Sequence, residues 1–169
     1  IFSKQFVKNK KKSILFIEDS LEQVNKSYNN SVDEKITLKN FEDFFKVLSK
    51  NNYTIYYKTH PSYEKRTRLF KLLNKKFSKN IILLDNIVPS EIYIDNFDIL
   101  SSGTTSTHRR YFKNKIILNF KNLYKFDNKT YQKYFNTEFK SNLSLKTKRE
   151  NKFFFLEKNN FQKLNKFLS

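Results

Sequence analysis

The sequence contains no cysteine, methionine, tryptophan or alanine, and only one glycine and two prolines among its 169 residues. Without cysteine it has no disulfide, no thiolate ligand for zinc and no cysteine nucleophile. Because Gly103 is the only glycine, the glycine-rich loops of dinucleotide-binding and P-loop proteins are excluded. Two histidines are too few for a histidine metal cluster, so we expect no metal and no cofactor. The chain opens on Ile1 without any methionine, so we expect it to be a piece of a longer protein.

No run of residues approaches the ~20 apolar positions that a membrane-spanning helix needs. The formal net charge is +18, which is typical of nucleic-acid-binding proteins. The basic residues are mostly lysine, however, and the chain is also rich in Asn, Ile and Phe, all of which have A/T-rich codons. We therefore interpret the charge as a solvated lysine-rich surface and expect no nucleic acid as partner.

The 19 Phe and 10 Tyr provide enough large apolar surface for a folded core. Short runs of continuous rather than alternating apolarity predict strands that are buried on both faces, as in a parallel sheet. The predicted strands cover residues 13–17, 53–57, 81–84, 97–102 and 115–120.

Helical segments alternate with these strands. Phe41, Phe44, Phe45 and Leu48 form one apolar stripe and predict a helix over 37–50, with Asn40 or Asp43 at its start. Further helices are predicted at about 62–77, from 89 onward, at 107–112 and at the C-terminus, and an irregular loop at 21–36. The alternation predicts an α/β fold: a Rossmann-like parallel sheet with helices on both faces. We expect residues 1–12 to be a linker, 13–120 the Rossmann-like domain, and 121–169 an extension that ends in a helix.

Ligands of open α/β sheets bind beyond the carboxyl ends of the strands. Polar residues follow three of the predicted strands: Lys58-Thr59-His60-Pro61, Asp85 to Glu91, and Ser101 to Thr107. Pro61 biases His60 away from the helical region, so the imidazole is presented in a fixed direction. There it could pair with a phosphate, although a plain surface histidine explains the dipeptide equally well.

The segment 101–107 places six Ser or Thr around Gly103, just before a predicted helix. Helix N-termini bind anions, and N-capping alone would need one such residue, so an anion site is favoured. Glu91 could bind the hydroxyls of a ribose or simply stabilise a helix start. Lys58 could neutralise a phosphate. The acidic pair Glu18-Asp19 ends the first strand and could contact substrate, but we expect only solvated charges there.

The order of these parts resembles the C-terminal half of bacterial sialyltransferases of glycosyltransferase family 52 and of the related capsular polysialyltransferases. The resemblance covers about residues 12–120 and rests on Lys58-Thr59-His60-Pro61, Pro89-Ser90-Glu91 and the region from Asp98 to Thr107. It implies a GT-B lobe that binds CMP-sialic acid, with His60 contacting the phosphate and assisting its departure. Glu91 would hold the ribose.

In the same comparison a Ser-Ser or Ser-Thr motif holds the phosphate or the nucleotide. Spacing from the following strand favours Thr105, Ser106 and Thr107 for this role, with Ser106 first. The resemblance also implies a metal-independent inverting glycosyltransferase whose catalytic base is an acidic residue of an N-terminal lobe, so that no residue of this chain is assigned as base. Similar motifs occur in transferases for Kdo and for glycerol phosphate, and these donors remain alternatives.

The resemblance further implies a glycan or glycolipid acceptor at the cell surface, as in lipooligosaccharide or capsule synthesis. We expect a cytoplasmic location, including the inner face of the cytoplasmic membrane. A basic nucleic-acid-binding module is the competing interpretation from another class. The sequence gives no indication of the oligomeric state.

Overall fold

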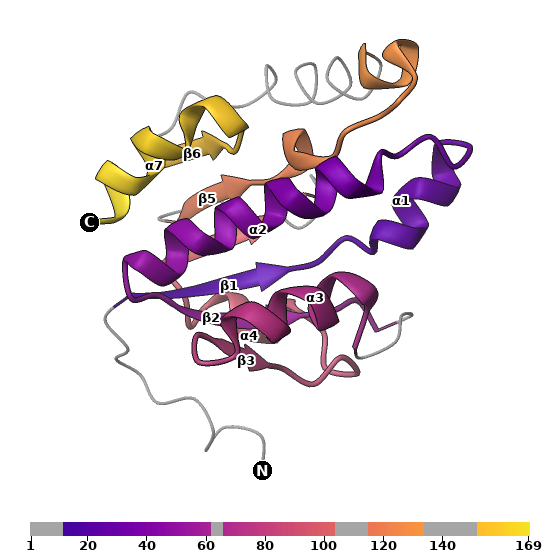
Figure 1. Ribbon diagram of the computed structural model, residues 1–169. Coiled ribbons are helices and arrows are strands. Elements are labelled where there is room, and N and C mark those ends of the chain that lie inside the picture. Colours follow the sequence, from indigo (N-terminus) through magenta and orange to yellow (C-terminus); the bar gives the residue numbers. More distant parts are fainter. Residues whose placement is uncertain (1–11, 62–65, 104–114, 134–151) are drawn as a thin grey trace.

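The computed structural model describes residues 12–61, 66–103, 115–133 and 152–169 (Figure 1). Its centre is a single six-stranded sheet in which every neighbouring pair of strands is parallel. The strands are β1 (Ser13–Ile17), β2 (Thr54–Lys58), β3 (Ile81–Leu83), β4 (Ile99–Ser102), β5 (Ile116–Asn119) and β6 (Lys152–Phe155).

The strand order is β3-β2-β1-β4-β5-β6, which is the order of the Rossmann fold. The chain runs outward from β1 to β3 on one side and then returns to place β4 on the other side of β1. The topological switch point therefore lies between β1 and β4. The predicted fold class is confirmed, and the structure adds β6, a strand that the sequence pattern did not predict.

The described α-helices include α1 (Leu21–Ser27), α2 (Glu34–Lys50), α3 (Arg68–Phe77), α4 (Glu91–Ile94) and α7 (Phe161–Leu168). Residues 129–133 are also helical. Helix α2 begins earlier than predicted because its N-cap is Asp33, whose side chain accepts from the backbone N–H of Ile36. The expectation of a loop at 21–36 was wrong for α1: Ser20 caps this helix and Leu21 is buried beneath it. The helix predicted at 107–112 and part of the one predicted from 62 lie outside the described residues.

Two apolar cores lie on opposite faces of the sheet. Helices α2, α3 and α7 cover one face, where Ile14 and Phe16 of β1 point. The intervening residues Leu15 and Ile17 belong to the other core, which includes residues of α4. Strand β1 is thus buried on both sides, as its continuous apolarity predicts.

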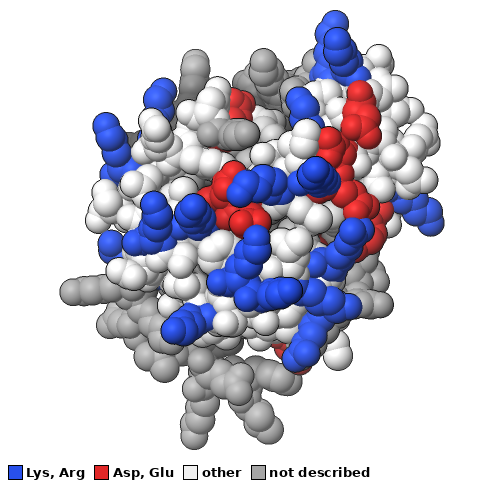
Figure 2. Space-filling view, in the orientation of Figure 1, with Lys and Arg blue, Asp and Glu red and all other residues white. Residues whose placement is uncertain are grey.

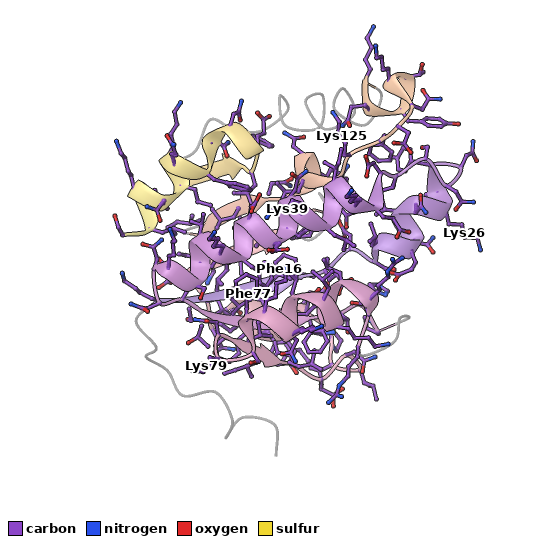
Figure 3. All side chains as sticks on the ribbon, viewed as in Figure 1. Phe16, Lys26, Lys39, Phe77, Lys79 and Lys125 are labelled. Atoms are coloured by element: carbon purple, nitrogen blue, oxygen red, sulfur yellow. The ribbon has the colours of Figure 1, made fainter. Side chains whose placement is uncertain are left out.

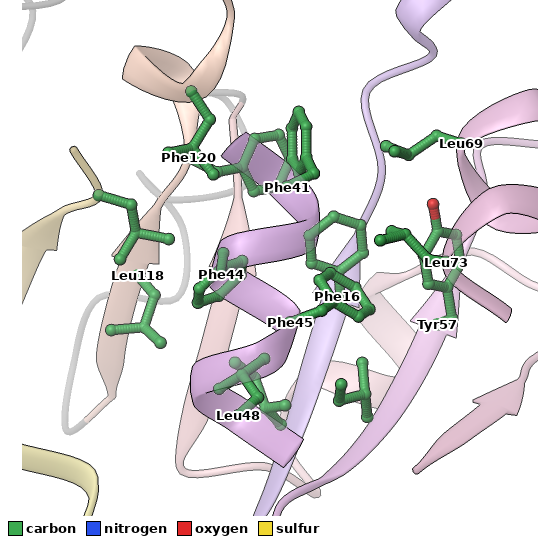
Figure 4. Packing of buried hydrophobic residues seen from close by; sticks show 14 of the residues in the cluster. Phe16, Phe41, Phe44, Phe45, Leu48, Tyr57, Leu69, Leu73, Leu118 and Phe120 are labelled. Atoms are coloured by element: carbon green, nitrogen blue, oxygen red, sulfur yellow. The ribbon is translucent and has the colours of Figure 1, made fainter. Parts of the chain in front are cut away.

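The larger core is aromatic, and Phe16 lies at its centre (Figure 4). The ring centroid of Phe16 is 5.1 Å from that of Phe45, 4.9 Å from that of Tyr57 and 5.0 Å from that of Phe120. The predicted stripe of α2, which includes Phe41 and Phe44, is completely buried against it. Because these residues come from β1, β2, α2 and the end of β5, their packing joins the central strands to the main helix.

Most of the described lysines lie at the surface, as the composition suggested, whereas Lys58 is buried. Lys26, Lys79 and Lys125 extend from the periphery, whereas Phe16 lies inside (Figure 3). On the face formed by α2 and α3, acidic side chains are interspersed among the basic ones (Figure 2). Lys39 and Lys76 there contact Glu42, Lys76 at 2.7 Å. None of the described helices has the length and apolarity needed to cross a membrane.

Replacing Phe16 by Leu should lower the free energy of unfolding by about 1–3 kcal/mol, because the ring contacts and part of the buried area are lost. Urea denaturation measures this change. Ile87→Ala is the control: Ile87 is 77% exposed, so its truncation should change stability by no more than about 0.5 kcal/mol. Equal effects of the two substitutions would contradict the position of Phe16 at the core centre.

Candidate functional site

The site is built at the carboxyl edge of the sheet, around the switch point. Ile17 of β1 pairs with Lys58 of β2 on one side and with Ser102 of β4 on the other. The next residues along these strands are Glu18, Thr59 and Gly103. We call the place beyond them, at the switch point, the crevice. Ligands of open α/β sheets bind at this place because the loops of neighbouring strands diverge there.

Buried polar atoms without a partner gather at the same edge. Among the described residues, four buried side-chain atoms make no hydrogen bond: Glu18 Oε1, Thr59 Oγ1, Ser101 Oγ and Asn119 Nδ2. They come from the carboxyl ends of β1, β2, β4 and β5. Buried polar groups are normally paired, and each unpaired one costs about 1–3 kcal/mol. Their concentration on four adjacent strand ends indicates a place prepared for a polar ligand.

Glu18 is a deeply buried carboxyl of the crevice, with 2% of its surface exposed. Its Oε2 accepts hydrogen bonds from the hydroxyls of Tyr57 and Thr67, both at 2.7 Å. Burial raises the pKa of the carboxyl to about 7, although the two hydroxyls act in the opposite direction. The expectation of a solvated charge was therefore wrong for Glu18.

Asp19 is half-buried and lies directly over Gly103. A Cβ atom on Gly103 would come within 2.2 Å of Asp19 Oδ2 and 2.8 Å of the Phe120 ring. Glycine is needed here for close approach, and its φ is not in the left-handed region. Burial raises the pKa of Asp19 to about 7, with Lys121 opposing. A carboxyl with such a pKa is a suitable general base near neutral pH.

Lys58 has a different environment from the one expected of a phosphate-binding lysine. Its side chain is only 1% exposed, and Nζ donates to the backbone carbonyls of Thr59 at 2.5 Å and Asn86 at 3.0 Å. Burial lowers the pKa of Lys58, while Asp85 and Glu91 nearby raise it. Lys58 thus braces the end of β2 against the segment that follows β3.

The remaining predicted residues lie in different parts of this edge. His60 and Pro61 are exposed just beyond β2, and Glu91 is exposed at the start of α4. The electrostatic interaction of Glu91 with Lys58 places it beside the same strand end as His60. Thr105, Ser106 and Thr107 lie outside the described residues.

From the sequence, Glu18 and Asp19 were expected to be solvated charges. Their position could have indicated otherwise, because the two acids directly follow the central strand, at the point where the strand order reverses. Thr67 and Asn119 were missed. No local pattern distinguishes them, because their partners are distant in the sequence or, for Asn119 Nδ2, not present among the described residues.

The parallel sheet and its strand order define an α/β protein with a Rossmann-like fold. The chain belongs to the alpha-2,8-polysialyltransferase family, since a model of that family matches residues 2–112. The match spans both the acidic pair and the His60-Pro61 segment. No curated protein and no solved structure matches the chain. The resemblance drawn from the sequence is confirmed for the polysialyltransferase group, and with it a sialyltransferase-type glycosyltransferase.

Gly103→Ala should destabilise the protein by about 1–3 kcal/mol, because the added methyl group displaces the Asp19 carboxyl and presses on the Phe120 ring. When Asp19 is already replaced by Ala, Gly103→Ala should lower the free energy of unfolding by less, because the clash with the Asp19 carboxyl is gone. Chemical denaturation of both single variants and the double variant measures this coupling. Strictly additive effects would show that Asp19 does not occupy the space over Gly103.

Stability should decrease as the pH rises from about 4.5 to 7. In this range the folded protein still holds the proton on Glu18, while the unfolded chain has released it, so the folded state binds more protons. Asp19 acts in the same direction. Glu18→Gln should remove up to roughly 3 kcal/mol of this decrease, since an amide oxygen can still accept from Tyr57 and Thr67.

Denaturation curves at pH 4, 5, 6, 7 and 8 measure the effect. Asp98→Asn is the control, because Asp98 is an exposed carboxylate. A free energy of unfolding that rises between pH 5 and 7 in the wild type would contradict the raised pKa of Glu18. So would the same dependence of stability on pH in Glu18→Gln as in the wild type.

Proposed function

We propose that this chain is the donor-binding domain of a sialyltransferase-like glycosyltransferase. It binds a CMP-activated acidic sugar, CMP-sialic acid, in the crevice between β1 and β4, for transfer to a cell-surface glycolipid or polysaccharide. The observation that carries the proposal is the group of four buried, unpartnered polar atoms at this edge, in a chain of the alpha-2,8-polysialyltransferase family.

The roles of the individual residues are assigned from the family resemblance. His60, exposed beyond β2, pairs with the phosphate and stabilises the charge that develops on departing CMP. Glu91 holds the ribose hydroxyls, and Ser106 with Thr107 holds the phosphate. Lys58 contributes by bracing the strand end, since its ammonium group is already bound to two carbonyls.

Transfer with inversion needs a group that accepts the proton of the acceptor hydroxyl. The oxygen of that hydroxyl attacks the anomeric carbon while the bond from this carbon to the CMP phosphate breaks, and the proton passes to a carboxylate. We assign this role to the Glu18-Asp19 pair, of which Asp19 is the more accessible member. The base then lies within this chain, rather than in another lobe as the resemblance implied.

The broader architecture is also part of the proposal. The domain corresponds to the C-terminal lobe of a GT-B enzyme that acts in the cytoplasm, at the inner face of the membrane. Positive charge comes from His60 and backbone N–H groups, so the reaction needs no metal ion.

Calorimetric titration with CMP tests the proposal. Wild-type chain should bind CMP, and His60→Ala should weaken binding about tenfold, the loss expected for one charged hydrogen bond. Asp19→Asn should leave CMP binding within about twofold but abolish sugar transfer, because an amide cannot accept the proton. Lys79→Ala, an exposed lysine remote from the crevice, is the control.

The same titration with CMP-Kdo, CDP-glycerol and short DNA and RNA at two salt concentrations separates the alternatives. Binding to nucleic acid through a basic surface weakens steeply with salt and does not depend on His60. Absence of CMP binding together with tight polynucleotide binding would overturn the proposal.

A further inference from the structure

Glu18 holds the chain on both sides of the segment that carries His60. Its backbone N–H donates to the carbonyl of Lys58 at 2.9 Å, just before that segment. Its side-chain Oε2 accepts from Thr67 Oγ1 at 2.7 Å, just after it. One residue at the end of β1 therefore binds the end of β2 and the start of α3.

Thr67 uses its hydroxyl twice. As the N-cap of α3 it accepts from the backbone N–H of Phe70 at 3.1 Å, and it donates its proton to Glu18. Asp, Asn and Ser cap helices at least as well as Thr. Capping alone therefore does not explain the bond to Glu18, for which a donating hydroxyl is needed.

Tyr57 makes a second bond to the same oxygen, also at 2.7 Å. It belongs to β2 and is held by strand pairing and by ring contacts with Phe16 and Phe70. Thr67, in contrast, stands at the junction between α3 and the chain that comes from His60 and Pro61. Of the two hydroxyls, only that of Thr67 therefore bears on where this chain lies.

We propose that Thr67 is a positioning residue: its hydrogen bond to Glu18 fixes the start of α3 and thereby the place of His60 at the crevice. The inference rests on the proposed function only for the role of His60 toward a nucleotide, because the geometry itself involves no ligand. The bond is short and buried, so its loss frees the start of α3 from the end of β1.

The test compares Thr67→Val and Thr67→Gly with Thr67→Ser. Valine preserves the shape and removes the hydroxyl; glycine is nearly as good an N-cap as threonine and has no side chain that could bond Glu18, so the start of the helix is kept while the bond is lost. Tyr57→Phe is the matched control, because it deletes an equally short bond to the same oxygen outside the His60 segment. The chain has only two histidines, so His60→Gln assigns the imidazole C–H signals in NMR spectra.

Thr67→Val and Thr67→Gly should shift the His60 signals and weaken CMP binding about tenfold, whereas Thr67→Ser and Tyr57→Phe should leave both close to wild type. Unchanged His60 signals in Thr67→Val and Thr67→Gly, or an equal shift in Tyr57→Phe, would overturn the inference. If the wild-type chain does not bind CMP, the proposed function fails, while the His60 signals still decide the role of Thr67.

Discussion

The pairing of β1 with both β2 and β4 is the constraint on which the rest of the structure depends. Both edges of this strand are hydrogen-bonded in parallel, and its alternate side chains enter two separate cores. Phe16 places the aromatic rings of α2 and β5 around the strand. Because the chain reverses its order at β1, the residues that follow this strand lie where the loops diverge. The position of Glu18 and Asp19 is therefore a consequence of the fold.

Lys58, the most buried of the described lysines, is turned away from Glu18. Lys58 lies in the same register row as Ile17, whereas the Glu18 side chain points to the opposite face, toward Tyr57. The ammonium group of Lys58 is bound to backbone carbonyls, so among the described residues it does not neutralise the pair. A surface of high positive charge thus surrounds two carboxyls whose pKa is raised by burial. Such pairs are common in catalytic sites, because a group that exchanges a proton near pH 7 must be partly desolvated.

Most of the fold could be predicted from the sequence because the relevant signals are local. The continuous apolar runs gave five strands, and the stripe from Phe41 to Leu48 gave α2. Strand β6 was missed because its four residues follow a Lys- and Asn-rich stretch, and its pairing with β5 is a tertiary effect. Helix α1 was missed because only Leu21 is buried in a polar, Asn-rich stretch, so there is no apolar stripe.

Parallel pairing alone predicts that polar residues at the strand ends converge at one edge of the sheet. Which of them are buried depends on partners far away in the sequence: Glu18 meets Thr67 from 49 residues away, and Lys58 meets Asn86 from 28. No pattern in the sequence encodes these pairings, so the burial of Glu18 and of Lys58 was not predicted.

Gly103 shows how fold and function are joined in this protein. In a chain with one glycine, that residue stands where a Cβ atom would collide with both the Asp19 carboxyl and the Phe120 ring. The ring belongs to the core around Phe16, and the carboxyl belongs to the crevice. A larger residue would have to displace one or the other. The glycine therefore permits the aromatic core to extend to the sheet edge while an acidic group remains directly above it. The sequence predicts phosphate binding for the 101–107 segment, of which the structure describes the first three residues. The close approach of Asp19 to Gly103 is a second, independent reason for a glycine at this place.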